Sequence, residues 1–103
     1  MQEIKTTTDS KEHALLLSKI IIKNKFAACS QIIGPITSTY MWNNQLQEET
    51  EWKILFKTTA QHVDIVIKTI KENHHYEIPE ITSNPIDYIS PDYKNWVLTT
   101  LKT

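Results

Sequence analysis

Two adjacent histidines, a tyrosine and two glutamates surround one proline in residues 74–80, HHYEIPE. Imidazole binds borderline metals such as copper and zinc, and Glu77 or Glu80 could add a carboxylate ligand. Adjacent histidines rarely point the same way, so one chain offers one imidazole and one carboxylate, too few for a tight metal site. The structural alternative is a helix end, where one histidine caps the last carbonyls and the other is solvated.

Cys29 and Lys57 are the next candidates for chemistry. Cys29 could act as a metal ligand or a nucleophile, although a cysteine after two alanines at a strand start is more often a small buried side chain. Lys57 lies near the end of a strand and needs a partner, either Glu80 or an anionic ligand. We therefore expect a binding cleft that holds Lys57, Tyr76, Glu77 and Cys29.

Aromatic residues supply the remaining candidates. Tyr40 and Trp96 could line the same cleft, whereas Trp42, Trp52 and Trp96 are expected to pack at contacts between subunits. No serine, histidine and aspartate form a hydrolase signature, and no oxyanion hole is recognisable. Acid–base chemistry by a buried Lys/Tyr/Glu/His cluster is the only enzymatic alternative, so we expect a protein without catalytic activity.

The composition excludes several function classes. The formal charge is −1 and the 11 cations are all lysines, so the arginine forks that grip phosphate or read guanine are missing and nucleic acid is not expected as a partner. Gly34 is the only glycine, which excludes a P-loop and a dinucleotide-binding fingerprint. One cysteine cannot form an internal disulfide, and residues 14–22 are too short to span a membrane, so we expect a cytoplasmic protein.

The hydrophobic pattern predicts the elements that position these residues. Threonines favour a strand over residues 2–8, and apolar spacing after Asp9 or Ser10 predicts a helix from about 11 to 24. A short strand over 26–35 is expected to end at Gly34-Pro35. Two alternating strands, joined by a tight turn at 43–45, should form a hairpin; they cover residues 36–42 and 49–58.

The second half repeats the pattern of helix and strand. Apolar residues at helical spacing predict a helix over 60–73, Pro79 blocks its continuation, and residues 80–85 form a last short strand. Ser90 and Pro91 suit the start of a terminal helix, with Tyr93, Trp96, Val97 and Leu101 on one side.

This order of elements is βαββαβ plus a helix, so we predict a single α+β, ferredoxin-like domain over residues 1–103. Both helices cover one face of such a sheet and leave the other face bare. A strand from about 46 to 58 would extend roughly 40 Å at ~3.3 Å per residue. Long apolar hairpin strands of this kind aggregate in a monomer, which favours an oligomer whose sheets pack on one another.

Five segments, in this order and spacing, resemble the CutA-type divalent-cation tolerance proteins: AAC ending at Cys29, GPITSTYMW (34–42), EWKILFKT (51–58), HHYEIPEI (74–81) and YKNW (93–96). The resemblance extends from about Thr6 to Leu101. It implies a ferredoxin-like homotrimer with the architecture of the PII signalling proteins.

The chain departs from the family pattern at several positions. His75 occupies the place of a proline in the usual His-Pro-Tyr-Glu motif, and Asn44 lies where the hairpin turn commonly has glycine. The segment TTD (7–9) replaces a Thr-x-Pro signature. Some members have a further cysteine at the position of Thr6, and its loss weakens any copper site built on that strand and His74.

The resemblance implies a divalent-cation (copper) tolerance protein, a homotrimeric metal-ion-binding protein that acts in response to metal ions. We expect copper or another divalent cation to bind weakly at His74, with Cys29 and Glu77 as lesser ligands. The alternative is a PII-like sensor or scaffold that binds a small anion or a protein in an intersubunit cleft. The candidate residues of that cleft are Tyr40, Lys57, Tyr76, Glu80 and Trp96.

Overall fold

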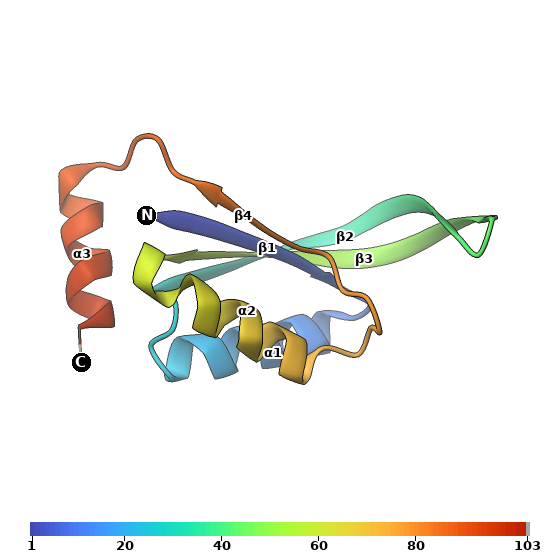
Figure 1. Cartoon of the computed structure of the whole chain (residues 1–103), viewed down its shortest axis with the longest axis horizontal. Helices are drawn as coiled ribbons and strands as arrows, with labels where there is room; N and C mark the ends of the chain where they lie inside the picture. The colour runs from blue at the N-terminus through green and yellow to red at the C-terminus, as the bar shows by residue number, and fades with distance from the viewer. Residues whose placement is uncertain (103) are drawn as a thin grey trace.

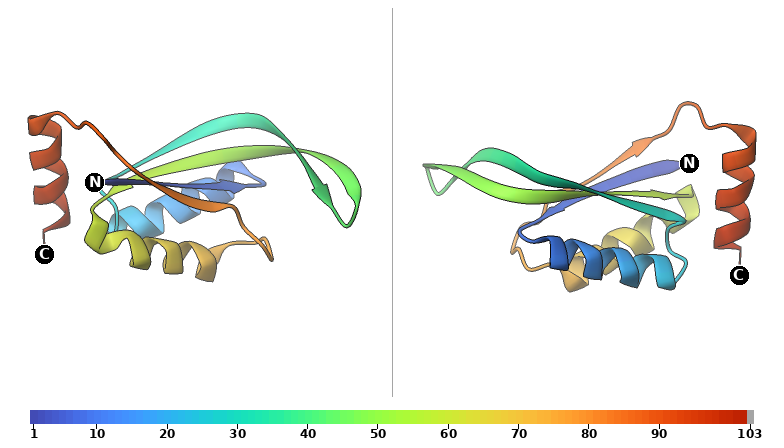
Figure 2. Two further views of the ribbon diagram at one scale, coloured as in Figure 1. Left: turned by 45° about the horizontal axis from the view of Figure 1, so that its top comes forward. Right: turned by 180° about the vertical axis from the view of Figure 1, so that it is seen from behind.

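The computed structural model describes residues 1–102 and contains one four-stranded antiparallel sheet in the order β2-β3-β1-β4. Two helices cover one face of the sheet, and the third helix stands at one end of it (Figures 1 and 2). The predicted α+β, ferredoxin-like order is confirmed. The elements are β1 (Gln2–Thr8), α1 (Lys11–Lys23), β2 (Cys29–Trp42), β3 (Gln45–Thr58), η1 (Ala60–His62), α2 (Val63–Asn73), β4 (Ile81–Pro85) and α3 (Pro91–Leu101).

The core lies between the sheet and the two long helices. Alternate residues of β1 and β3 point toward the helices, and apolar residues at helical spacing on α1 and α2 point back. The large apolar side chains that are fully buried in this core are those of Ile4, Leu17, Ile21, Ile54, Phe56, Val66 and Ile70. This packing holds the C-terminal end of β1 beside the start of α1 and the end of α2. The HHYEIPE segment begins at that end of α2.

Strand β2 runs through Gly34 and Pro35, so the prediction that a strand ends there is wrong. The pairing of β2 with β3 shifts register between Ile33 and Ile36, and the strand continues beyond this irregularity. A Cβ atom at Gly34 would lie 2.8 Å from Trp52 Cγ, so glycine allows the indole to pack across the strand. Trp52 therefore packs in part against the core of its own chain.

The hairpin of β2 and β3 extends well past the rest of the sheet. The pairing of β1 with β3 ends at Thr8 and Trp52, whereas β2 and β3 remain paired out to Trp42 and Gln45. Positive φ angles of 51° and 62° at Asn43 and Asn44 form the predicted tight turn. The molecule is 46 Å long in consequence, and the projecting hairpin bends at its end (Figure 2).

Helix α3 packs on the end of the sheet opposite to the hairpin tip. Ser90 and Pro91 begin it as predicted, and Val97 and Leu101 pack against Ala28. Trp96 stacks on Tyr93 with ring centroids 5.6 Å apart and remains half-exposed in the single chain. No helix of residues 1–102 is long and apolar enough to cross a membrane.

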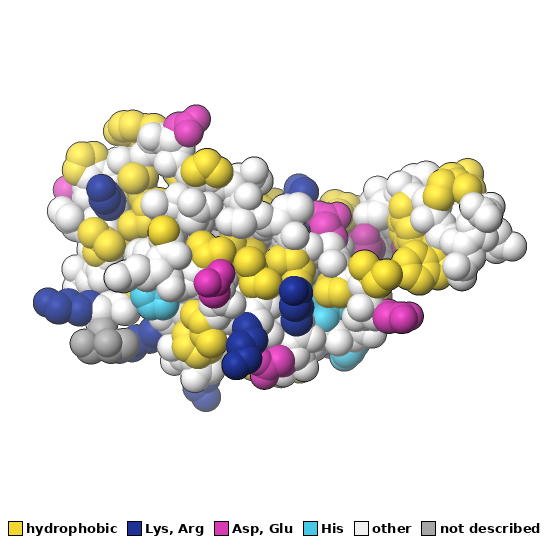
Figure 3. Space-filling view, in the orientation of Figure 1, with side chains coloured by type: hydrophobic (Ala, Val, Ile, Leu, Met, Phe, Trp, Pro, Cys, Tyr) yellow, Lys and Arg dark blue, Asp and Glu magenta, His cyan; other side chains and the backbone are white. Residues whose placement is uncertain are grey.

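Large apolar side chains remain exposed at both ends of the molecule. Hydrophobic surface covers parts of the hairpin and of the end that bears α3 (Figure 3). On the hairpin, Met41 and Leu46 are cross-strand partners with 61% and 73% of their surface exposed. A two-stranded ribbon has little stability by itself, so this region needs a partner surface to bury these side chains.

Candidate functional site

The HHYEIPE segment is the junction between α2 and β4. Helix α2 ends at Asn73, and His74 already has extended backbone with φ −83° and ψ 145°. Pro79 and Glu80 have no regular secondary structure, and β4 begins at Ile81. The predicted end of the helix and start of the strand are both confirmed.

His74 holds this junction against the end of β1. Its Nε2–H donates to the Thr7 carbonyl oxygen at 2.7 Å, and its Nδ1 accepts from the Tyr76 backbone N–H at 3.0 Å. Both bonds form together only when the ring is neutral and carries its proton on Nε2. Burial lowers the pKa of His74, and the bond to Thr7 partly offsets that effect. A metal bound to either nitrogen would therefore replace a hydrogen bond.

His13, a residue that the sequence analysis did not select, packs beside the junction. It is 3% exposed, and neither of its ring nitrogens has a hydrogen-bond partner among residues 1–102. His75 stacks on it with ring centroids 3.5 Å apart, and His75 Nδ1 lies 3.9 Å from Asp9 Oδ1. Burial, then the charges of His75 and His74, lower the pKa of His13. His13 lies on the same side of α1 as the buried residues Ala14 and Leu17, so helical spacing could have indicated that His13 is buried.

We expect these histidines to make the folded protein sensitive to acid. The folded pKa values of His13 and His74 lie below the ordinary value of about 6.5 that applies to the unfolded chain. The unfolded chain therefore binds more protons once the pH falls below about 6.5, and the free energy of unfolding decreases. We expect the loss not to exceed about 1.4 kcal/mol per pH unit for each histidine.

Urea unfolding at pH 7.5, 6.5 and 5.5, at fixed protein concentration, measures this loss. The variant His13→Leu keeps the buried volume and removes one titrating group, so its stability should fall less steeply between pH 6.5 and 5.5. A slope equal to that of the wild type would show that His13 does not contribute to the acid sensitivity.

Tyr76 and Glu51 link the junction to the hairpin. The Tyr76 hydroxyl donates to Glu51 Oε2 at 2.7 Å, and Glu51 is only 7% exposed. Burial, followed by this hydrogen bond, raises the pKa of the Tyr76 hydroxyl above its ordinary value. Nothing in the sequence singles out Glu51, because its place in the alternation of β3 does not indicate that another segment covers it.

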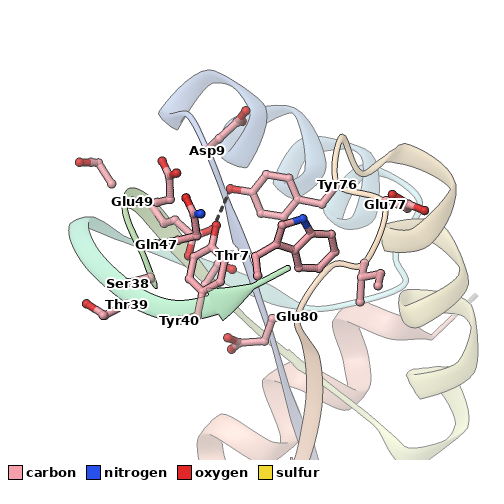
Figure 4. A pocket seen from close by; sticks show the side chains of 14 residues that line it. Thr7, Asp9, Ser38, Thr39, Tyr40, Gln47, Glu49, Tyr76, Glu77 and Glu80 are labelled. Carbon is pink, nitrogen blue, oxygen red and sulfur yellow. Dashed lines mark hydrogen bonds between the residues drawn. The ribbon is translucent and has the colours of Figure 1, made fainter. Parts of the chain in front are cut away.

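A cavity of about 820 Å³ lies between the junction, the end of β1 and the projecting hairpin. Figure 4 shows Tyr40 and Gln47 of the hairpin facing Tyr76 of the junction, with Asp9, Glu49 and Glu80 around them. The lining residues are Thr7, Asp9, Ser38, Thr39, Tyr40, Trp42, Gln47, Glu49, Thr50, Glu51, Tyr76, Glu77, Ile78 and Glu80. The cavity thus combines aromatic walls with five carboxylates.

The structure brings together only part of the predicted cleft. Tyr40, Tyr76, Glu77 and Glu80 line the cavity. Cys29 and Lys57 are paired at the opposite end of β3, level with Glu3 of β1. One chain therefore does not place Lys57 and Cys29 beside Tyr76 and Glu77.

The partners of Lys57 within the chain are Gln31 and Glu3, not Glu80. Its Nζ donates to Gln31 Oε1 at 3.0 Å and lies 3.8 Å from Glu3 Oε2. Glu80 instead pairs with Lys5 at 3.3 Å, so the expectation that Lys57 binds Glu80 is wrong.

The three predicted metal ligands do not converge within one chain. His74 lies at the junction, Glu77 lies beside it on the cavity wall, and Cys29 lies at the other end of the sheet. Cys29 lies near Tyr93, and burial, followed by this neighbouring thiol, raises the pKa of the Tyr93 hydroxyl. Within residues 1–102, no three His, Cys, Asp or Glu side chains form a group that could hold a metal ion.

Comparison with known proteins assigns the chain to a family. The family model described as CutA1 divalent ion tolerance protein matches residues 3–100. The divalent-cation tolerance protein CutA of Escherichia coli is 31% identical over 86 residues, which cover 84% of this chain and 77% of that protein.

Solved structures of CutA proteins share the fold as well. The divalent ion tolerance protein CutA1 of Ehrlichia chaffeensis superimposes with a TM-score of 0.95 at 30% identity, covering 99% of this chain and 95% of that one. The periplasmic divalent cation tolerance protein CutA of Archaeoglobus fulgidus gives 0.95 at 29% identity, covering 99% and 100%. With the whole fold and nearly the whole sequence matched, the chain belongs to the CutA1 divalent ion tolerance protein family.

Proposed function

We propose that this protein acts in divalent-cation tolerance as a homotrimer that binds metal ions, copper first among them, and has no catalytic activity. The match of the CutA1 family model to residues 3–100 carries the proposal. The projecting hairpin, with Met41 and Leu46 exposed on a ribbon that no other strand supports, favours the trimer. The cytoplasm is the proposed location, because a chain with one cysteine forms no internal disulfide and suits a reducing compartment.

Metal binding by the junction should be weak. A metal on His74 must replace a bond to the Thr7 carbonyl or to the Tyr76 N–H, and Glu77 is the carboxylate proposed to join it. Cys29 could contribute only from another subunit, since it lies at the far end of its own sheet. Protonation of the imidazole competes with the metal, so binding should weaken as the pH falls.

Calorimetric titration with copper and zinc at pH 7.5 and 5.5 tests this proposal. We expect weak binding at pH 7.5 that is lost at pH 5.5 and in His74→Ala, and that remains in His75→Ala. Circular dichroism must first show that each variant is folded. Binding that is lost only in His75→Ala would assign the metal to the more exposed imidazole and leave His74 with its structural role. Binding unaffected by pH would place the metal away from both histidines.

The cavity beneath the hairpin favours a second candidate function, a sensor that binds a small molecule. Its volume of about 820 Å³ lies in the range of small-ligand sites, and aromatic and polar side chains from three segments line it. Because two of its walls come from the projecting hairpin, assembly of the trimer would convert the cavity into an intersubunit cleft.

A further inference from the structure

The charge of the cavity lining determines which ligands it can accept. Among the described residues, its wall includes five carboxylates and no lysine or histidine. Lys5 pairs with Glu80, and His75 Nδ1 lies 3.9 Å from Asp9 Oδ1, but neither Lys5 nor His75 lines the cavity. Glu49 and Glu77 have no ion-pair partner within residues 1–102. An anionic ligand would meet uncompensated negative charge on several sides, so the small anion expected from the sequence does not fit this wall.

Glu51 is the carboxylate that most needs a positive partner. It is more than nine-tenths buried, and its only side-chain hydrogen bond within residues 1–102 comes from the Tyr76 hydroxyl to Oε2. That hydroxyl is neutral, and no lysine or histidine forms an ion pair with Glu51 in the described chain. A buried carboxylate is costly unless a charge or several hydrogen bonds compensate it. A ligand with an ammonium group in the cavity would supply both a positive charge and hydrogen-bond donors.

The size of the cavity and the arrangement of its carboxylates argue against a bare metal ion as the positive partner of Glu51. Calcium requires about six to eight oxygen ligands at 2.3–2.6 Å, and magnesium requires octahedral geometry. Within residues 1–102, no three acidic or imidazole side chains come close enough to hold a metal. The space of about 820 Å³ is instead suited to an organic molecule.

The aromatic walls specify the cation further. Tyr40 and Trp42 of the hairpin and Tyr76 of the junction line the cavity, and Figure 4 shows Tyr40 and Tyr76 on facing sides of it. The face of an aromatic ring attracts an ammonium or guanidinium group, and desolvation strengthens that attraction. Methylene groups of the same ligand can pack on these rings.

We propose that the cavity binds an organic amine, whose ammonium group pairs with Glu51 while its methylene groups pack between Tyr76 and the hairpin aromatics. Either Glu49 or Glu77, which lie on opposite sides of the cavity (Figure 4), would take a second ammonium group, so a diamine or polyamine fits best. This inference rests on the proposed ligand-binding function of the cavity and names the class of its ligand.

Calorimetric titration of the full-chain protein with spermidine at pH 7.5 tests the inference. The matched probes are 1,4-butanediol, which lacks charge, inorganic phosphate and ATP, which are anionic, and magnesium chloride, a bare cation. We expect saturable binding of spermidine and none of the other four. The variant Glu51→Gln keeps an oxygen for Tyr76 and removes the charge, so it should weaken spermidine binding at least about tenfold.

Glu48→Gln is the control, because it removes the same charge from a residue three positions earlier in β3 that does not line the cavity. Should Glu51→Gln fail to fold, Glu77→Gln on the exposed junction should weaken spermidine binding while Glu48→Gln does not.

Equal weakening in the Glu48 control, or magnesium binding as tight as spermidine binding, would show that the cavity only attracts cations in general and would overturn the inference. If phosphate or ATP binds and spermidine does not, the cavity is still a ligand site but its ligand is not an amine, and the inference is overturned. If no organic probe of either charge binds, the ligand-binding function fails as well.

Discussion

Replacing Trp42 with glutamate is expected to convert the trimer into monomers at micromolar concentration. Trp42 is the last residue of β2, and 44% of its surface is exposed in the single chain although it is a large apolar side chain. In the proposed trimer this surface packs against a neighbouring subunit. A glutamate there would be buried without a partner, at a cost of about 3–5 kcal/mol per subunit, and would face the carboxylates of the cavity.

Light scattering after size exclusion measures the result directly. The wild type should have about three times the chain mass, and Trp42→Glu should have the mass of one chain with a lower melting temperature. Trp42→Phe keeps an aromatic side chain and should remain trimeric. A wild-type monomer would contradict the proposed assembly. A Trp42→Glu trimer with unchanged melting would show that the subunit contact lies elsewhere on the hairpin.

Replacing His74 with alanine should cost about 2–4 kcal/mol of stability, because two backbone groups lose their hydrogen-bond partner at once. One of them is the carbonyl of Thr7, a residue that is almost completely buried. The neighbouring His75→Ala is the control, since His75 is exposed and makes no hydrogen bond within the described chain. It should cost less than about 1 kcal/mol, chiefly through its stacking on His13.

Urea unfolding at pH 7.5 compares the two variants, and His74→Asn provides a partial rescue by restoring one amide donor. Similar losses for His74→Ala and His75→Ala would mean that the two hydrogen bonds contribute little. The same comparison separates the structural role of His74 from metal binding, because no metal is present in the unfolding experiment.

The hairpin connects the proposed assembly to the proposed ligand site. It projects beyond β1 and carries Tyr40 and Trp42, so the cavity walls and the exposed apolar surface belong to one element. A ligand that orders the hairpin would therefore also favour association of the subunits, and association would favour ligand binding by the same factor.

Periodicity predicted the elements well because helices and strands depend on local spacing. The apolar residues of α1 and α2, the alternation of β3 and the caps at Ser10 and Ser90 all follow from neighbours within a few residues. The strand end predicted at Gly34-Pro35 was wrong for a tertiary reason. The indole of Trp52 crosses the strand at Gly34, so a residue that usually marks a turn instead allows close packing.

By itself the sequence determined the order of elements, the ferredoxin-like fold, the hairpin turn and the junction at residues 74–80. It also identified His74, Tyr76 and Glu77 as residues of one locality, since they are neighbours in the chain. Only the tertiary structure decided that Cys29 and Lys57 lie at the opposite end of the sheet, that His13 packs under His75, and that Glu51 pairs with Tyr76. These contacts depend on strand register and on how a helix end crosses a sheet, and neither is encoded in the spacing of nearby residues.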